Sequence, residues 1–179
     1  LLLAAPGIDV NKANKYGYTP LSAATANGHT ECVRLLLAAP GIDVNKANKY
    51  GYTPLSAATA NGHTECVRLL LAAPGININQ ANQDGRTPLI NAALRGHTEC
   101  VRLLLAAPGI DVNMADKDGK TPLFWAAHNG HTECVRLLLA APGIDVNLAD
   151  KDGRTPLSAA EQRGQTECAR LIRAAGGRR

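Results

Sequence analysis

One segment of this chain recurs every 34 residues, and that period constrains the fold more than any other feature. Residues 1–42 recur without a change as residues 35–76, and one glycine marks the same point of every copy: Gly17, Gly51, Gly85, Gly119 and Gly153. Periods of roughly 20–50 residues are typical of stacked repeats, in which each unit buries its apolar face only against its neighbours. We therefore expect one array of stacked units without linkers.

Each unit carries the signals for two short helices and an arm. Thr19 precedes Pro20 in TPLSAATANG, which predicts a threonine cap and a proline at the first helical position, where no N–H is needed. Gly28 is expected to end this helix in the left-handed conformation. Thr30 is expected to cap a second helix, ECVRLLLAA, that ends before the Pro-Gly pair. The rest of the unit reads as an extended arm with a tight turn near Gly17.

These motifs together match a known family. The stretch DGRTPLINAALRGHTECVRLLLAAPGIDVN resembles the ankyrin repeat in its TPL helix start, GH turn, LL core pair and D-V-N arm, and similar copies cover nearly the whole chain. The resemblance implies an all-α fold: an ankyrin-repeat solenoid of stacked helix-turn-helix units joined by β-hairpin-like arms. Two features depart from the family pattern. The unit has one residue more than the usual length of about 33, and other residues replace the TPLH histidine: Ser22, Ser56, Ile90, Phe124 and Ser158.

We interpret residues 1–179 as a single ankyrin-repeat domain. Residues 1–16 form a partial preceding repeat and arm, the five repeats start near the marker glycines, and residues 166–179 form a cap-like C-terminal end. Leu1, Leu2 and Leu3 begin in the middle of a predicted helix with no polar cap before them, so we expect self-association through this end. At the other end Arg173 replaces a leucine of the other copies, which suits the polar outer face of a terminal repeat.

Composition and charge narrow the function classes. The apolar runs are much shorter than the about 20 residues that span a bilayer, so we expect no membrane insertion, and a net charge of +4 identifies no anionic partner. The five cysteines occur once per repeat, and equivalent residues of stacked helices lie too far apart for a disulfide. We expect each thiol to be a small buried apolar group. Unpaired thiols favour a reducing compartment, the cytoplasm or the nucleus.

Motifs that resemble catalytic or metal sites are better explained as structure. The HTEC string at residues 29–32 groups possible zinc ligands, but no C-x-x-C accompanies it, and we expect its histidine to hold the inter-helix turn. The DKDG strings at 116–119 and 150–153 have glycine in the wrong place for a calcium loop. No P-loop, G-x-G-x-x-G, G-x-S-x-G or H-E-x-x-H motif is present. The sequence therefore predicts no enzyme, no cofactor and no metal site.

A nucleic-acid partner is disfavoured. The first two arms combine four lysines with four tyrosines (Lys12, Lys15, Lys46 and Lys49 beside Tyr16, Tyr18, Tyr50 and Tyr52), which is a pattern of cationic and stacking groups. However, Asp9 and Asp43 share these arms, and the later arms carry further aspartates, which repel phosphates.

The copies differ in the arm tip and the first helix, whereas residues 28–41 are unchanged through the first four copies. The family resemblance implies that these variable positions line a concave groove that binds partners, and aromatic residues and arginine dominate interface energies. We predict the following partner-binding residues on this concave face: Tyr16, Tyr18, Tyr50, Tyr52, Asp84, Arg86, Leu94, Asp118, Lys120, Phe124, Trp125, His128, Asp152 and Arg154. For Phe124 and Trp125, packing between repeats is an equally good interpretation.

The predicted function is a non-catalytic protein–protein interaction scaffold that binds a protein partner through this groove. The identity of the first two copies favours two alternatives: a structural spacer segment of a longer ankyrin array, or an engineered repeat scaffold with no natural partner.

Overall fold

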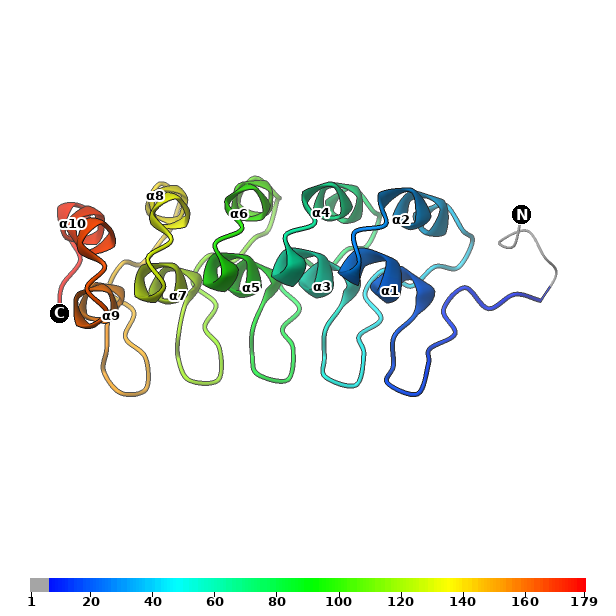
Figure 1. Ribbon diagram of the computed structural model, residues 1–179, viewed down its shortest axis with the longest axis horizontal. Coiled ribbons are helices and arrows are strands. Elements are labelled where there is room, and N and C mark those ends of the chain that lie inside the picture. The colour runs from blue at the N-terminus through cyan, green and yellow to red at the C-terminus, as the bar shows by residue number, and fades with distance from the viewer. Residues whose placement is uncertain (1–6) are drawn as a thin grey trace.

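The computed structural model describes residues 7–179, and in this range the chain forms ten α-helices arranged in two rows (Figure 1). Odd-numbered helices form one row and even-numbered helices the other, and the arms project from the odd row on the side away from the even row. The helices are α1 (Pro20–Ala26), α2 (Thr30–Leu37), α3 (Pro54–Asn61), α4 (Thr64–Leu71), α5 (Pro88–Arg95), α6 (Thr98–Leu105), α7 (Pro122–His128), α8 (Thr132–Leu139), α9 (Pro156–Gln162) and α10 (Thr166–Ala174). The predicted all-helical stack is therefore confirmed.

The first helix of each repeat starts as the sequence predicts. Thr19 lies just before α1 in an extended conformation, and its hydroxyl accepts a hydrogen bond from the Ser22 N–H at 3.1 Å. The Ser22 hydroxyl in turn accepts from the Thr19 N–H, so two N–H groups that the helix leaves free are satisfied. Gly28 follows with φ of 71°, the left-handed value expected at the end of this helix.

The prediction that Thr30 caps the second helix is wrong. Thr30 is the first residue of α2, and His29 occupies the cap position without a side-chain hydrogen bond. In the later repeats this histidine contacts the preceding repeat. His63 Nε2 lies 3.1 Å from the Ala26 carbonyl oxygen, and His97 and His131 make the equivalent contact in the next two repeats. The histidine thus links consecutive repeats instead of holding only its own turn.

A continuous core runs through the stack because each repeat buries the same few side chains. In α3 and α4 these include Leu55, Ala58, Val67 and Leu70, and all are fully buried. Burying one such Leu or Val stabilises the fold by about 1.5–3 kcal/mol. Each repeat packs its two helices on the helices of the next one, so the core extends by repetition rather than around a centre.

The predicted β-hairpin form of the arms is not confirmed, because the arms within residues 7–179 contain turns and no strand. In the second repeat the side-chain oxygen of Asn48 accepts from the N–H groups of Tyr50 and Tyr52 and closes the tip as a turn. Gly51 is needed in this turn for two reasons. Its φ is 81°, and a Cβ at this position would lie 2.7 Å from the Gln83 backbone nitrogen of the next tip.

A row of asparagines joins the bases of the arms. Asn113 donates from Nδ2 to the Gly143 carbonyl at 2.8 Å, and its Oδ1 accepts from the Asp145 N–H at 2.9 Å. The same pair of bonds recurs from each of these side chains to the backbone 29–32 residues later: Asn11, Asn45, Asn79, Asn113 and Asn147. We call this row the asparagine ladder.

The C-terminal residues end the ladder in place of a further arm. The Arg178 N–H donates to Asn147 Oδ1 at 2.7 Å, and the Arg178 carbonyl accepts from the Thr155 hydroxyl at 2.6 Å. Arg173 and Arg179 both bind Glu161 at the exposed side of this last repeat. At the opposite end, Leu1, Leu2 and Leu3 lie outside the described residues.

Candidate functional site: the face of the arms and first helices

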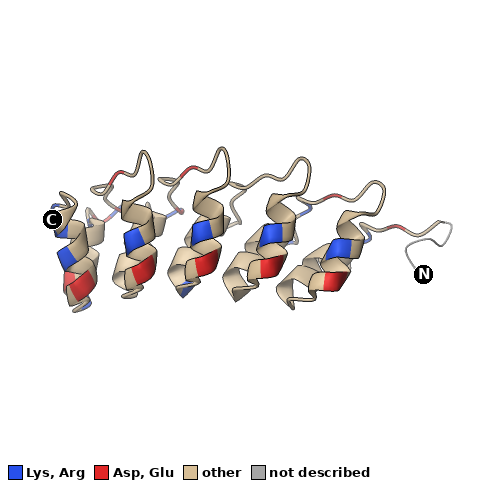
Figure 2. Ribbon diagram, turned by 90° about the horizontal axis from the view of Figure 1, so that it is seen from above, with Lys and Arg blue, Asp and Glu red and all other residues tan. Residues whose placement is uncertain are grey.

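The arm tips and the odd-numbered helices form one long surface, which we call the arm face. It lies opposite the outer face, formed by the even-numbered helices (Figure 1). On the outer face each helix repeats one Glu–Arg pair at positions i and i+3, with N–O distances of 3.1–3.3 Å in the first four pairs, and Figure 2 shows this as the same two bands on every helix. All fourteen residues predicted to bind a partner belong to the arms and odd-numbered helices.

The tyrosines gather at the N-terminal half of the arm face. Tyr16 and Tyr50 are exposed, at 48% and 53%, whereas Tyr18 and Tyr52 are half-buried. A hollow of about 190 Å³ lies between consecutive repeats here, and Tyr18, Tyr50, Tyr52 and Ala57 are among the residues that line it. The structure therefore brings three of the four predicted tyrosines to one hollow. Its walls are aromatic rings with their polar hydroxyl ends, which suits contact with a side chain of a partner.

A second group of predicted residues gathers around Trp125 in the C-terminal half. Lys120 Nζ and the Arg86 guanidinium lie 5.1 Å and 5.3 Å from the centre of the indole ring, within the range of cation–π attraction. The indole N–H donates to Asp116 Oδ2 at 2.9 Å, which fixes the orientation of the ring. Because Trp125 is only half-buried, one side of this cationic and aromatic group is open to solvent.

Phe124 and Trp125, for which the sequence allowed either packing or partner binding, differ in their burial. Phe124 is 1% exposed, packs edge-on against Trp125 and stacks on His128 with ring centres 6.0 Å apart. Phe124 is therefore a packing residue, and it does not face a partner in the folded chain. Trp125 and His128 keep part of their surface on the arm face.

Charge around His128 is positive. Burial lowers the pKa of His128 from its ordinary value, and the nearby charges of Arg163, Arg154 and Lys120 lower it further. Both effects disfavour the charged imidazolium, because burial removes its hydration and like charges repel it. The neutral imidazole is therefore favoured over the imidazolium.

The remaining predicted residues belong to three arm tips and one helix. Lys120 pairs with Asp118 at 3.2 Å, and Arg154 pairs with Asp150 and Asp152 at 2.7 Å and 2.9 Å. Burial opposes the ionisation of Asp150, but hydrogen bonds from Arg154 and from backbone N–H groups outweigh it, so the pKa of Asp150 is lowered. Asp84 is exposed at its tip, and Leu94 is half-buried at the end of α5.

The sequence analysis missed the residue that closes each tip. Asn48 closes the second tip, and Asn82, Asp116 and Asp150 occupy the same position in the next three. The signal was present, since every copy carries Asn or Asp there, yet it resembled ordinary turn chemistry. All four hold the tip backbone, and Asp116 and Asp150 also bind variable side chains of the arm face.

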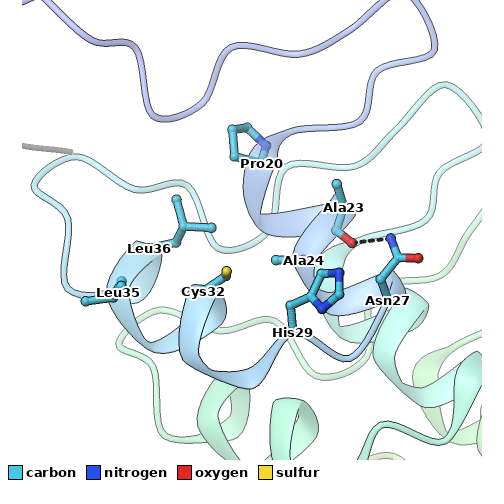
Figure 3. A pocket seen from close by; sticks show the side chains of 8 residues that line it. All are labelled: Pro20, Ala23, Ala24, Asn27, His29, Cys32, Leu35 and Leu36. Atoms are coloured by element: carbon cyan, nitrogen blue, oxygen red, sulfur yellow. Dashed lines mark hydrogen bonds between the residues drawn. The ribbon is translucent and has the colours of Figure 1, made fainter. Parts of the chain in front are cut away.

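The first described repeat leaves one apolar face uncovered. A hollow of about 410 Å³ opens there beside α1 and α2 (Figure 3), lined by Pro20, Ala23, Ala24, Asn27, His29, Cys32, Leu35 and Leu36. In the next repeat the equivalent side chains, such as Cys66 and Leu70, are buried against α1 and α2. This corrects one prediction: Cys32 is exposed, and only the other four thiols are buried.

Burial raises the pKa of each of those four thiols: Cys66, Cys100, Cys134 and Cys168. A threonine hydroxyl of the preceding repeat, 3.6–3.9 Å from each sulfur, opposes this rise in pKa but does not outweigh burial. Thiolate formation is therefore disfavoured, as expected for thiols that act as small apolar groups.

Within the part of the chain that the structure describes, no three His, Cys, Asp or Glu side chains are placed to hold a metal ion. None of the ten helices described above is long and apolar enough to cross a bilayer.

The chain was compared with known proteins. A family model described as ankyrin repeats, in three copies, matches residues 1–82, 43–116, 71–150 and 106–177. These overlapping matches extend over nearly the whole chain. No curated protein matches it significantly.

Proposed function

Since the chain belongs to the ankyrin-repeat family, we propose that it is a non-catalytic scaffold that binds a protein partner through the groove of its arm face. Ankyrin repeats generally mediate protein–protein interaction, and the family is typically non-catalytic. The proposed contact residues are the predicted ones without the buried Phe124. The reducing compartment, cytoplasmic or nuclear, remains part of this proposal.

One observation carries the proposal: side-chain variety is concentrated on the arm face, whereas α2, α4, α6 and α8 of the outer face have the same sequence, TECVRLLL. The outer face repeats the same Glu–Arg pair in every repeat, and an exposed pair of this kind contributes only a few tenths of a kcal/mol. On the arm face one position changes from tyrosine to arginine or lysine, and another changes from alanine to asparagine or tryptophan. Tyrosine, arginine and tryptophan are residue types that dominate interface energies. A face that is only exposed to solvent does not require these changes of residue type between repeats.

The first two repeats are identical, and this favours the second candidate function, a spacer segment of a longer array. A groove tuned to one partner has no need for two identical tips. The two functions differ in what the tyrosine hollow does: a scaffold loses its partner when the hollow is removed, whereas a spacer loses nothing.

The test uses three baits: the wild-type chain, Tyr50→Ala with Tyr52→Ala, and Arg68→Ala with Arg102→Ala. Proteins retained by the wild type are identified by quantitative mass spectrometry, and the purified partner is then titrated calorimetrically against all three. We expect the tyrosine variant to weaken binding by about 1–4 kcal/mol, the range of interface hot spots, and the arginine variant to change it little. Circular dichroism first establishes that both variants fold. The reverse ranking, or equal retention by all three baits, contradicts the scaffold proposal.

We also propose that two copies associate through the apolar face beside α1 and α2. Leu35 is 54% exposed there, and burying such a side chain is worth about 1.5–3 kcal/mol. Ala23→Glu places a charge in this face, and Ala106→Glu places the same charge at the exposed end of α6. Light scattering at increasing concentration is expected to show dimers for the wild type and Ala106→Glu, and monomers for Ala23→Glu. A wild type that stays monomeric throughout refutes the association.

A further inference from the structure

The third arm tip differs from its neighbours in the residue that closes it. In the fifth repeat, Asp150 accepts the N–H groups of the tip through Oδ1, and its Oδ2 accepts from Arg154 Nε and Nη2 at 3.0 Å and 2.7 Å. In the third repeat, Asn82 also accepts the tip N–H groups through Oδ1, at 2.9 Å each. The second atom of its side-chain head is Nδ2, however, so a donor stands where Asp150 has an acceptor.

The residue four positions later makes this difference matter. The two tyrosine tips pair an asparagine with a tyrosine (Asn14 with Tyr18, Asn48 with Tyr52), and the last two tips pair an aspartate with a cation (Asp116 with Lys120, Asp150 with Arg154). Only the third tip pairs an asparagine, Asn82, with a cation, Arg86. Its guanidinium therefore has no carboxylate at the closing position of its own tip.

The neighbouring repeat does not replace the missing acceptor. Asp116 Oδ2 lies 3.9 Å from Arg86 Nε, which is an ionic contact but too long for a hydrogen bond. That oxygen already accepts from Trp125 Nε1, and Oδ1 accepts from the Asp118 and Lys120 N–H groups. Both oxygens of Asp116 therefore make their hydrogen bonds within its own repeat, and Arg86 has only the longer ionic contact.

Three buried side-chain donors are consequently left without an acceptor: Asn82 Nδ2, Arg86 Nε and Asn91 Nδ2. They are the only buried side-chain nitrogen or oxygen atoms without a partner in residues 7–179, and all three come from one repeat. Asn82 and Asn91 are 7% and 3% exposed. In the next repeat the equivalent pair, Asp116 and Trp125, is joined directly at 2.9 Å, so Asn82 and Asn91 occupy positions whose side chains meet on the arm face.

The charge around these donors favours an anion. Arg86 and Lys120 flank the ring of Trp125, and the odd-numbered helices carry only one carboxylate, Glu161, which is bound to Arg173 and Arg179. At the neighbouring tip Asp118 is paired with Lys120. Two carboxylates oppose an anion here: Asp116, which is in ionic contact with Arg86, and Asp84, whose exposed side chain makes no ion pair among the described residues.

We propose that the third repeat binds a carboxylate of the partner: an acidic side chain that pairs with the part-exposed guanidinium of Arg86 beside Trp125, next to the unpartnered Asn82 Nδ2. The incoming carboxylate gives Arg86 the charged acceptor that Asp150 Oδ2 gives Arg154 two repeats later. This inference rests on the proposed function, because it specifies the chemistry of the partner at the same arm face. A peptide fits better than a nucleic acid, because one acidic side chain is enough for this single repeat, whereas a phosphate chain that follows the groove passes the aspartates of three consecutive tips.

The protein contains its own probe for this site. Trp125 is the only tryptophan of the chain, and it lies against Arg86 and Lys120. Its fluorescence is titrated with an acetylated and amidated hexaglutamate peptide, and with hexaglutamine as the neutral reference. We expect a saturable change with hexaglutamate that hexaglutamine does not produce.

The decisive variant is Asn82→Asp, which gives the third tip the aspartate–arginine pair of the fifth. Because the fifth tip already contains this pair, we expect the melting temperature of the variant to be equal to or higher than that of the wild type. We expect its affinity for hexaglutamate to fall about tenfold or more, because its own carboxylate now occupies Arg86. Arg68→Gln on the outer face changes the net charge by the same amount, and we expect its affinity to stay within about twofold of the wild type.

Three results overturn the inference. The first is that Asn82→Asp and the wild type bind hexaglutamate with equal affinity. The second is that Arg68→Gln loses as much hexaglutamate affinity as Asn82→Asp does. The third is that the wild type binds single-stranded poly(U) more tightly than hexaglutamate and that Asn82→Asp abolishes this binding. The proposed function fails separately. A partner that requires Tyr50 and Tyr52, together with no hexaglutamate binding, leaves the scaffold intact and removes only the carboxylate site.

Discussion

The asparagine ladder makes a strong prediction about stability, because each side chain joins two repeats by two hydrogen bonds. Asn113→Ala removes the bond to the Gly143 carbonyl at 2.8 Å and the bond from the Asp145 N–H at 2.9 Å. A net contribution of about 0.5–1.5 kcal/mol for each bond gives a loss of roughly 1–3 kcal/mol. Water reaches this part of the arm and can partly replace the lost partners, so the higher cost of a buried orphan group does not apply.

The assay is urea unfolding followed by circular dichroism, with thermal unfolding as a second measurement. For a chain of this size 1 kcal/mol corresponds to about 2–4 °C, so we expect the melting temperature to fall by roughly 2–12 °C. Asn61→Ala is the matched control, because Asn61 makes only one bond, at 2.9 Å, to Ala57 of its own helix. If Asn113→Ala and Asn61→Ala differ by less than about 0.5 kcal/mol, the ladder does not couple the repeats.

Two further predictions concern titratable groups. A soluble thiol reagent should modify one thiol, Cys32, much faster than the four buried thiols, because burial raises the pKa of those four. Cys32→Ser should abolish the fast phase of the reaction. More than one rapidly modified thiol contradicts the packing described above. The lowered pKa of His128 means that the unfolded chain binds its proton more readily than the folded chain. Stability from this residue is therefore present at neutral pH and is lost as the pH falls through the ordinary histidine value of about 6.5. The urea midpoint of His128→Gln should fall less than that of the wild type between about pH 7.5 and 5.5, and parallel curves refute this assignment.

Much of the fold follows from short-range signals in the sequence. The Thr-Pro start and the glycine end of the first helix depend on residues within one turn, and the structure confirms both. The period gave the stacking, because a unit of this size cannot bury its apolar face alone. Repetition therefore compensates for the weak signal of any single short helix.

The errors concern interactions between repeats. Cys32 and Cys66 have the same sequence neighbours, but α1 and α2 cover only Cys66, so burial differs where sequence does not. The histidine that was expected to hold its own turn instead reaches a carbonyl 37 residues earlier. The asparagine ladder spans about one repeat in the same way. Contacts between residues about one repeat apart in sequence depend on how the repeats stack, so the sequence pattern within one unit does not predict them.

The third tip shows how structure changes what counts as a conservative difference. Asparagine and aspartate both accept the tip N–H groups through Oδ1, so exchanging them leaves the turn unchanged. Their second atoms have opposite polarity, and this matters only when the residue four positions later is a cation. Tyr18 and Tyr52 form no hydrogen bond with the second atom of their asparagines, whereas Arg154 donates two hydrogen bonds to Asp150 Oδ2. The pairing of Asn82 with Arg86 is therefore the one tip in which local turn chemistry is satisfied and side-chain chemistry is not, and a partner's acidic group is the simplest acceptor to complete it.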